Sequence, residues 1–125
     1  MIISIDNRSG VTNSETTFRQ AKLDHALELL QNLDGLRHTL LFLNRDDGSQ
    51  MMIGGGPTDF VVTLSVGAKN FTLKNRNADE GILKSVCAGG QFGEFSASSC
   101  SKIEACLDII KSFFALTEHT ADWVD

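Results

Sequence analysis

DFVVTLSVG, residues 59–67, carries the most regular strand pattern in the chain. In an extended backbone Phe60, Val62, Leu64 and Val66 fall on one face, and the more polar residues between them fall on the other. A strand with one apolar face is typical of an antiparallel sheet that is covered on one side. We therefore expect this segment to lie in such a sheet.

Further strand patterns surround this segment and are separated from it by short turns. Asp46-Asp47-Gly48 is typical of a hairpin turn, and GGPTD forms the next turn. The other predicted strands span 2–5, 39–45, 49–55, 71–75, 82–89 and 92–97. Short connections between consecutive strands favour a meandering sheet.

Two segments show apolar residues at helical spacing. The first runs from about 15 to 33 and is followed by Gly35 as a terminator. Thr12 and Glu15 have the spacing of a capping box, and Ser14 is the alternative cap. The second runs from about 102 to 116, with Ser101 and Glu104 as its capping box. Both are predicted to be amphipathic helices.

These elements predict one α+β domain over residues 1–125. We expect a meandering antiparallel sheet of about five to six strands with both helices packed on one face. The other face would carry Thr63, Ser65, Thr72 and Lys74. It is either solvated or a docking surface.

The composition limits the cellular location of the protein and the classes of partner that it can bind. The formal net charge is −5, and the Lys and Arg residues are scattered. A nucleic-acid binder needs a basic surface, so no nucleic-acid partner is expected. No apolar run approaches the ~20 residues of a membrane span, and the N-terminus lacks the features of a signal peptide. We expect a cytoplasmic protein without a membrane partner.

The sequence shows no motif that would indicate an enzyme. Phosphate-binding glycine loops and the GxSxG nucleophile motif are absent. The three cysteines form no CxxC, and the three histidines lack metal-ligand spacing. We therefore expect no catalytic residues, no metal and no cofactor. Asp46 and Asp47 are explained by the hairpin turn.

CAGGQFGEF, residues 87–95, is unusual because it combines three glycines with two phenylalanines. Gly89 and Gly90 would permit a β-bulge or a close backbone approach. Phe92 and Phe95 would then lie on a kinked hairpin that leads to the second helix.

The C-terminal part of the chain resembles a bacterial immunity-protein family linked to deaminase-fold toxins of polymorphic and contact-dependent systems. The resemblance spans residues 60–125. It is carried by Gly89-Gly90-Gln91, by the helix with Ala105, Ile109 and Phe113-Phe114, and by Asp122-Trp123. Family members tend to have proline before the terminal Trp, where this chain has Thr117-Glu118-His119-Thr120.

The resemblance implies an inhibitor that binds a cognate toxin domain one-to-one and covers its active site or substrate groove. A toxin that acts on nucleic acid presents a basic groove, which an acidic partner can occupy. The candidate toxin-binding residues are Asp46, Asp47, Asp59, Asp79, Glu80, Phe92, Glu94 and Trp123. The alternatives are a small ligand-binding domain, a self-associating adaptor, and immunity to a nuclease toxin.

Overall fold

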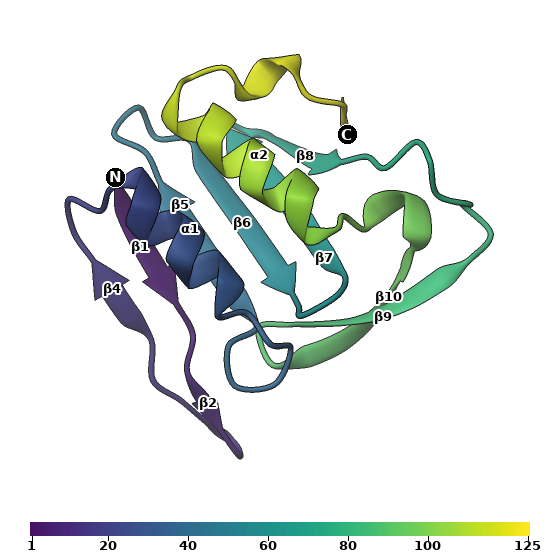
Figure 1. The fold of residues 1–125 in the computed structure, drawn as a ribbon. Coiled ribbons are helices and arrows are strands. Elements are labelled where there is room, and N and C mark those ends of the chain that lie inside the picture. The colour runs from purple at the N-terminus through teal and green to yellow at the C-terminus, as the bar shows by residue number, and fades with distance from the viewer.

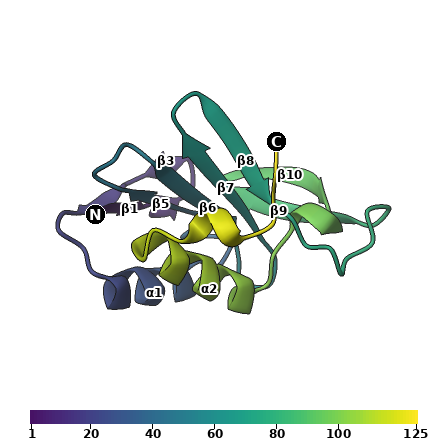
Figure 2. The ribbon, with the colours of Figure 1, turned by 90° about the horizontal axis from the view of Figure 1, so that it is seen from above.

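Two helices lie on one face of a seven-stranded antiparallel sheet in the computed structural model, which describes residues 1–125 (Figure 1). Figure 2 shows both helices below the sheet, side by side. The α+β class and the placement of the helices are confirmed. The sheet is longer than predicted, because two short strands extend its edges.

The centre of the sheet is a four-strand meander. It consists of β5 (Leu40–Asn44), β6 (Gln50–Gly55), β7 (Phe60–Val66) and β8 (Lys69–Leu73). β1 (Ile2–Ile5) lies beside β5, and β4 (Thr16–Phe18) forms the edge beyond it. At the opposite edge β11 (Trp123–Val124) pairs with β8. The chain termini therefore contribute to both sides of the meander.

The remaining elements are two hairpins, two α-helices and two short 3-10 helices. The hairpins are β2 (Arg8–Ser9) with β3 (Thr12–Asn13), and β9 (Leu83–Ala88) with β10 (Gln91–Ser96). The helices are α1 (Leu23–Gln31), η1 (Ala97–Ser99), α2 (Ile103–Phe114) and η2 (Glu118–Thr120). Neither α1 nor α2 has the length and apolar character of a membrane-spanning helix.

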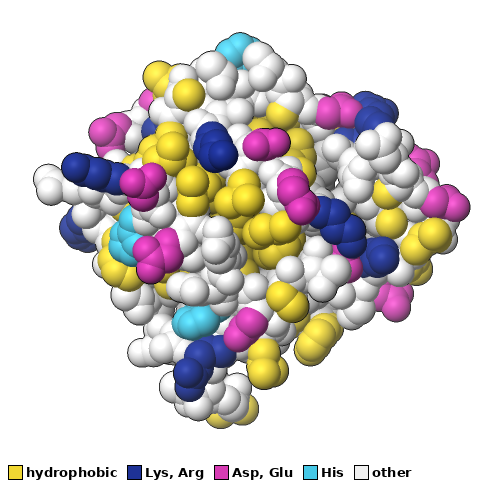
Figure 3. Space-filling model, in the orientation of Figure 1, with side chains coloured by type: hydrophobic (Ala, Val, Ile, Leu, Met, Phe, Trp, Pro, Cys, Tyr) yellow, Lys and Arg dark blue, Asp and Glu magenta, His cyan; other side chains and the backbone are white.

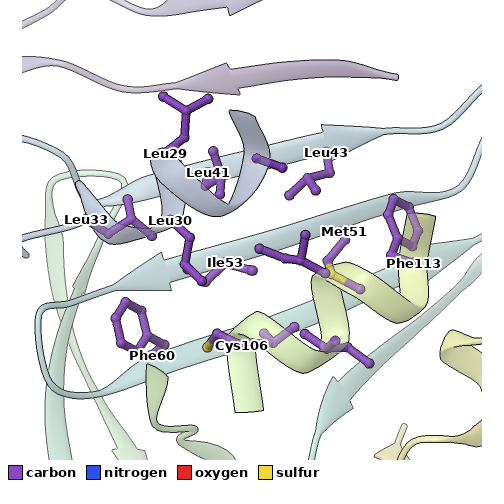
Figure 4. Close-up of a cluster of buried hydrophobic side chains, with 14 of the residues drawn as sticks. Leu29, Leu30, Leu33, Leu41, Leu43, Met51, Ile53, Phe60, Cys106 and Phe113 are labelled. Atoms are coloured by element: carbon purple, nitrogen blue, oxygen red, sulfur yellow. The ribbon is translucent and has the colours of Figure 1, made fainter. Parts of the chain in front are cut away.

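The core fills the space between the helices and the sheet (Figure 4). Alternate strand residues such as Leu41, Leu43 and Ile53 are fully buried against Leu30 of α1 and Phe113 of α2. Burial of such side chains contributes about 1.5–3 kcal/mol each. Cys106 lies in this cluster as a small apolar residue, and its burial raises the pKa of the thiol to about 12.

The predicted start of the first helix is wrong. Residues 16–18 form β4, in which Phe18 pairs with Ile3, and α1 begins only at Leu23. β-Branched Thr16 and Thr17 suit a strand, and pairing with β1 satisfies backbone groups that would otherwise form an open edge. The Thr12–Glu15 capping box therefore does not form, and Thr12 lies in β3.

The second capping box is also absent, although the helix itself is confirmed. α2 begins at Ile103 after Lys102, and no side chain caps it. Ser101 instead exchanges two backbone hydrogen bonds with Phe60, with N···O distances of 2.9 and 2.7 Å. This bridge fixes the start of α2 against the start of β7.

The predicted strands 82–89 and 92–97 form β9 and β10, but the expectation that they continue the meander is wrong, because they pair with each other in a separate two-stranded sheet. This hairpin packs on the face opposite the helices, where Ala88 and Phe95 share a small hollow with Leu40 and Gly54. A Cβ atom at Gly54 would lie 2.5 Å from the Cβ atom of Ala88. The glycine run at 54–56 thus permits β9 to approach the sheet closely, which the sequence alone did not indicate.

Candidate functional site

A hollow of about 500 Å³ lies where three chain segments meet at one end of the sheet. The segments are the β2–β3 hairpin, the loop 34–38 and the β9–β10 hairpin. The lining residues are Arg8, Gly10, Gly35, Leu36, Arg37, Cys87, Gly90 and Phe92. We call this surface the end hollow.

The end hollow gathers exposed apolar side chains. Leu36 is 80% exposed and Phe92 is 75% exposed, and Val11, next to Gly10, is fully exposed. These are three of the seven exposed large hydrophobic residues in the chain. Exposed apolar groups that gather at one place on a surface are typical of protein-interaction sites.

The buried carboxylate of Asp6 connects Arg8, which lines the end hollow, with Thr39. We call these three bonded residues the floor of the end hollow. Asp6 is 3% exposed and accepts hydrogen bonds from the Thr39 amide (2.6 Å), the Leu40 amide (3.0 Å) and the Arg8 Nε (2.7 Å). The Thr39 hydroxyl donates a fourth bond. Burial alone would raise the pKa of Asp6, but these hydrogen bonds from Thr39, Arg8 and Leu40 lower the pKa overall. Asp6 therefore stays ionised and fixes the segments around it.

The same network anchors the glycine turn of the β9–β10 hairpin. Gly89 and Gly90 have φ angles of +64° and +78°, which fit a two-residue type I′ turn. The Gly90 amide donates to the Thr39 hydroxyl at 3.0 Å. A Cβ atom at Gly90 would lie 2.5 Å from Nη1 of Arg8, so the guanidinium occupies the space of a side chain. The backbone of the glycine turn therefore approaches Arg8 closely, as expected for this run. The bond to Thr39 fixes the turn, which lies directly before Phe92 in β10.

The loop that carries Leu36 is also fixed by one carboxylate. Oδ1 of Asp34 accepts hydrogen bonds from the amides of Leu36 (2.9 Å), Arg37 (2.9 Å) and His38 (3.0 Å). The pKa of Asp34 is lowered because these bonds outweigh the opposing effect of desolvation. Nδ1 of His38 is 2.7 Å from the Asp6 carbonyl oxygen, which ties the loop to the floor. Leu36 is therefore presented on a rigid turn.

The predicted acidic contacts do not form one patch. Asp46 and Asp47 lie in the β5–β6 turn, whereas Asp79 and Glu80 lie in the loop before β9, on the other side of the molecule in Figure 1. Asp59 lies just before β7. Figure 3 shows acidic side chains spread over the face that the helices cover, between basic and apolar ones.

Several of these acids have partners within the chain. Asp47 pairs with Arg45 at 2.9 Å, Asp59 with Lys102 at 2.7 Å, and Glu80 with Lys74 at 3.1 Å. The hydrogen bond from Arg45 lowers the pKa of Asp47 to about 2. These carboxylates stabilise turns and helix ends.

The other three acids of the predicted set, Asp46, Asp79 and Glu94, have no cationic partner. The Asp79 carboxylate accepts a hydrogen bond from the Gly81 amide at 2.8 Å, which closes a local turn. Glu94 is exposed on β10, and no salt bridge includes it. Of the predicted acids, Glu94 lies nearest in sequence to the end hollow, two residues from Phe92.

Trp123 has a clear place in the fold. It pairs with Leu73 in the sheet, packs half-buried against the core, and donates from Nε1 to the Glu118 carbonyl oxygen at 2.8 Å. The half-buried ring therefore has a structural role in the fold. A contact of Trp123 with a toxin stays a prediction.

Phe92 was predicted from the sequence as a contact residue, whereas Leu36, Arg37, Val11 and Arg8 were not. A signal for Leu36 was present, because it is a large apolar residue directly after the helix-terminating Gly35. No sequence signal indicated that the β2–β3 tip lies beside the β9–β10 turn, since Arg8 and Gly90 are joined only by tertiary structure.

The described residues contain no group of three or more His, Cys, Asp or Glu side chains that could hold a metal ion. Comparisons with protein-family models and with curated proteins gave no match to this chain. The resemblance to immunity proteins therefore rests on the residues quoted for it.

Proposed function

We propose that this chain is an immunity protein, which binds a cognate bacterial toxin domain in the cytoplasm and neutralises it by covering its active site or substrate groove. The observation that carries the proposal is the end hollow, which is lined by two exposed side chains, Leu36 on the loop 34–38 and Phe92 on β10. The resemblance of residues 60–125 supports the same function.

The end hollow suits a tight protein contact. A few well-packed residues near the centre of an interface carry most of its binding energy. Binding is stronger when these side chains are held in place beforehand, because less conformational entropy is lost. Asp34 and the Asp6 network provide this order for Leu36 and Phe92.

Charged residues would contribute to toxin binding in two ways, through the long-range field of the whole chain and through local contacts at the end hollow. The net charge of −5 favours approach to a basic toxin groove and raises the association rate. The charged side chains that line the end hollow are Arg8 and Arg37, and Asp6 beneath them is buried. We therefore infer that the scattered acids steer the encounter, while the apolar groups and Arg37 make the central contact.

The resemblance favours a nucleic-acid-targeting deaminase as the toxin. A nuclease toxin remains the second candidate, because any enzyme that binds nucleic acid presents the basic groove on which the steering argument depends.

The test is co-expression of this chain with the toxin domain encoded next to it, with growth and co-purification as readouts. Leu36→Ala and Phe92→Ala should each weaken the complex by about tenfold or more, because each removes an interface centre. Val66→Ala is the matched control, since Val66 is 42% exposed but does not line the end hollow. It should protect as well as the wild type.

Two outcomes would contradict the proposal. The first is unchanged toxicity and no complex with the wild-type chain. The second is a complex that the Leu36→Ala, Phe92→Ala double variant forms as tightly as the wild type while its Tm is unchanged.

A further inference from the structure

β10 presents an unpaired strand edge next to the end hollow. It is six residues long and pairs only with β9. The backbone hydrogen bonds outside regular elements include none from residues 91–96. Phe92 and Glu94 are both exposed.

The turn geometry shows which backbone groups are free. In a two-residue hairpin the residues that flank the turn form a hydrogen-bonded pair, and the pairs then alternate. Ala88 and Gln91 flank the turn here, and Gly93 is paired with Val86. Gln91, Gly93 and Phe95 thus bond to β9. The N–H and C=O groups of Phe92 and Glu94 point away from β9, toward solvent.

The free edges of the main sheet are short, since β4 has three residues and β11 has two. The outer edge of β9 is as long as that of β10, but this strand contains Lys84. Short strands, prolines and lysines are the usual ways in which proteins prevent unwanted pairing at an edge. QFGEFS, residues 91–96, has none of these features. An unprotected edge of this length is suited to accept another strand.

We propose that an extended segment of the toxin domain adds as a strand to the free edge of β10. The inference rests on the proposed function and names the form of the contact. The edge is continuous with the end hollow, because Phe92 belongs to both. Residues of the added strand beside Phe92 would be apolar, and a residue beside Glu94 would be Lys or Arg.

Amide hydrogen exchange of this chain, free and in complex with the co-expressed toxin domain, tests the proposal directly. In the free protein the Gln91, Gly93 and Phe95 amides should already be protected, whereas the Phe92 and Glu94 amides should exchange quickly. In the complex the Phe92 and Glu94 amides should slow by about tenfold or more. Equal exchange rates of these two amides in both states would overturn the proposal.

A substitution gives an independent readout. Glu94→Pro removes an outward N–H while leaving the bonds to β9, and should weaken the complex by about tenfold. Glu94→Ala keeps the N–H and removes only the carboxylate, so it is the matched control. It should weaken the complex by no more than about threefold, which corresponds to the loss of one exposed cross-strand ion pair. If Glu94→Ala lost as much affinity as Glu94→Pro, the carboxylate would be the contact and strand addition would be wrong.

Two further results separate the possible failures. A wild-type chain that forms no complex with the toxin domain contradicts the proposed function. A wild-type complex whose Phe92 and Glu94 amides stay unprotected contradicts only strand addition. Light scattering that shows a dimer of the isolated chain, with these amides protected, would assign the edge to a second copy and overturn the proposal.

Discussion

The amide of Gly90 donates a 3.0 Å hydrogen bond to the hydroxyl of Thr39, 51 residues earlier in the chain. The same hydroxyl donates to the buried carboxylate of Asp6. One threonine side chain therefore connects the floor of the end hollow to the turn that presents Phe92. The order of the hollow depends on this connection and can be tested residue by residue.

Thr39→Val should destabilise the fold by about 2–3 kcal/mol. The substitution removes a donor to Asp6 and an acceptor for Gly90, and it leaves the buried carboxylate with one fewer bond. The free energy of unfolding in urea measures the loss. Thr63→Val is the control, because no hydrogen bond of the Thr63 side chain is seen, and its effect should stay within about 0.5 kcal/mol. Equal effects of the two substitutions would contradict the role of Thr39.

Gly90→Ala should destabilise the fold more than Gly10→Ala. Both glycines have positive φ angles, +78° and +61°, so alanine is strained at either by about 1 kcal/mol. Only at Gly90 does the new methyl group meet another group, the Arg8 guanidinium at 2.5 Å, whereas nothing lies within 4 Å at Gly10. Displaced Arg8 would lose its bond to Asp6. Thermal unfolding of both variants gives the comparison, and equal Tm losses would show that the contact with Arg8 is unimportant.

Stability should fall at acidic pH in part through Asp6. Its pKa is lower in the folded chain than the ordinary value of 3.8, so the folded state binds this proton less readily than the unfolded state. The resulting stabilisation is complete above the unfolded pKa. It is lost as pH falls from about 4 through the lower folded pKa.

Urea unfolding between pH 7 and pH 3 measures this dependence. Asp6→Asn should be less stable at pH 7 and should show a flatter decline at acidic pH. A decline as steep as that of the wild type would mean that other carboxyl groups cause the acid sensitivity.

Glu118→Gln should loosen the C-terminal tail. The Glu118 side chain is 10% exposed and receives a bond of 2.9 Å from Arg45, whose guanidinium lies 4.4 Å from the ring centre of Phe113. Loss of the charge leaves Arg45 without its nearest buried partner and should cost about 2–3 kcal/mol. Trp123 is the only tryptophan and bonds to the Glu118 carbonyl oxygen, so its fluorescence should shift to longer wavelength.

Arg76→Ala is the matched control for Glu118→Gln. It breaks the pair with Asp122, next to Trp123, but Arg76 is 65% exposed and such pairs contribute little. Its fluorescence and stability should remain near those of the wild type. A large effect of Arg76→Ala would show that the exposed pair holds the tail.

The sheet was predictable because its residues alternate. Phe60, Val62 and Leu64 are buried as the pattern indicated, and Val66 is exposed because it ends β7 beside the turn. The Asp46-Asp47-Gly48 turn was predicted for the same local reason. β4 was not, because helical spacing of Phe18 and Ala21 continued into α1, and only the partner strand β1 distinguishes the two structures.

The end hollow could be predicted only in part. Phe92 was predicted as a contact because large aromatic side chains are frequent anchors of protein interfaces. Leu36 and Arg8 were missed because they reach Phe92 through tertiary contacts of residues far apart in the sequence. Asp47 and Asp59 were predicted as toxin contacts because they are acidic residues in turns or at strand ends. Their salt-bridge partners, Arg45 and Lys102, could not be assigned from sequence spacing.

The Leu36 and Phe92 side chains are largely exposed, so the fold makes little use of them, whereas Gly35 directly before Leu36 and Gly90 in the turn before Phe92 have no space for a side chain. In the proposed interface, recognition and architecture are therefore carried by different atoms of the same short segments. We expect point mutations of Leu36 and Phe92 to alter what the surface binds without altering how the chain folds. A molecule built in this way can follow a changing partner over generations while its scaffold stays constant.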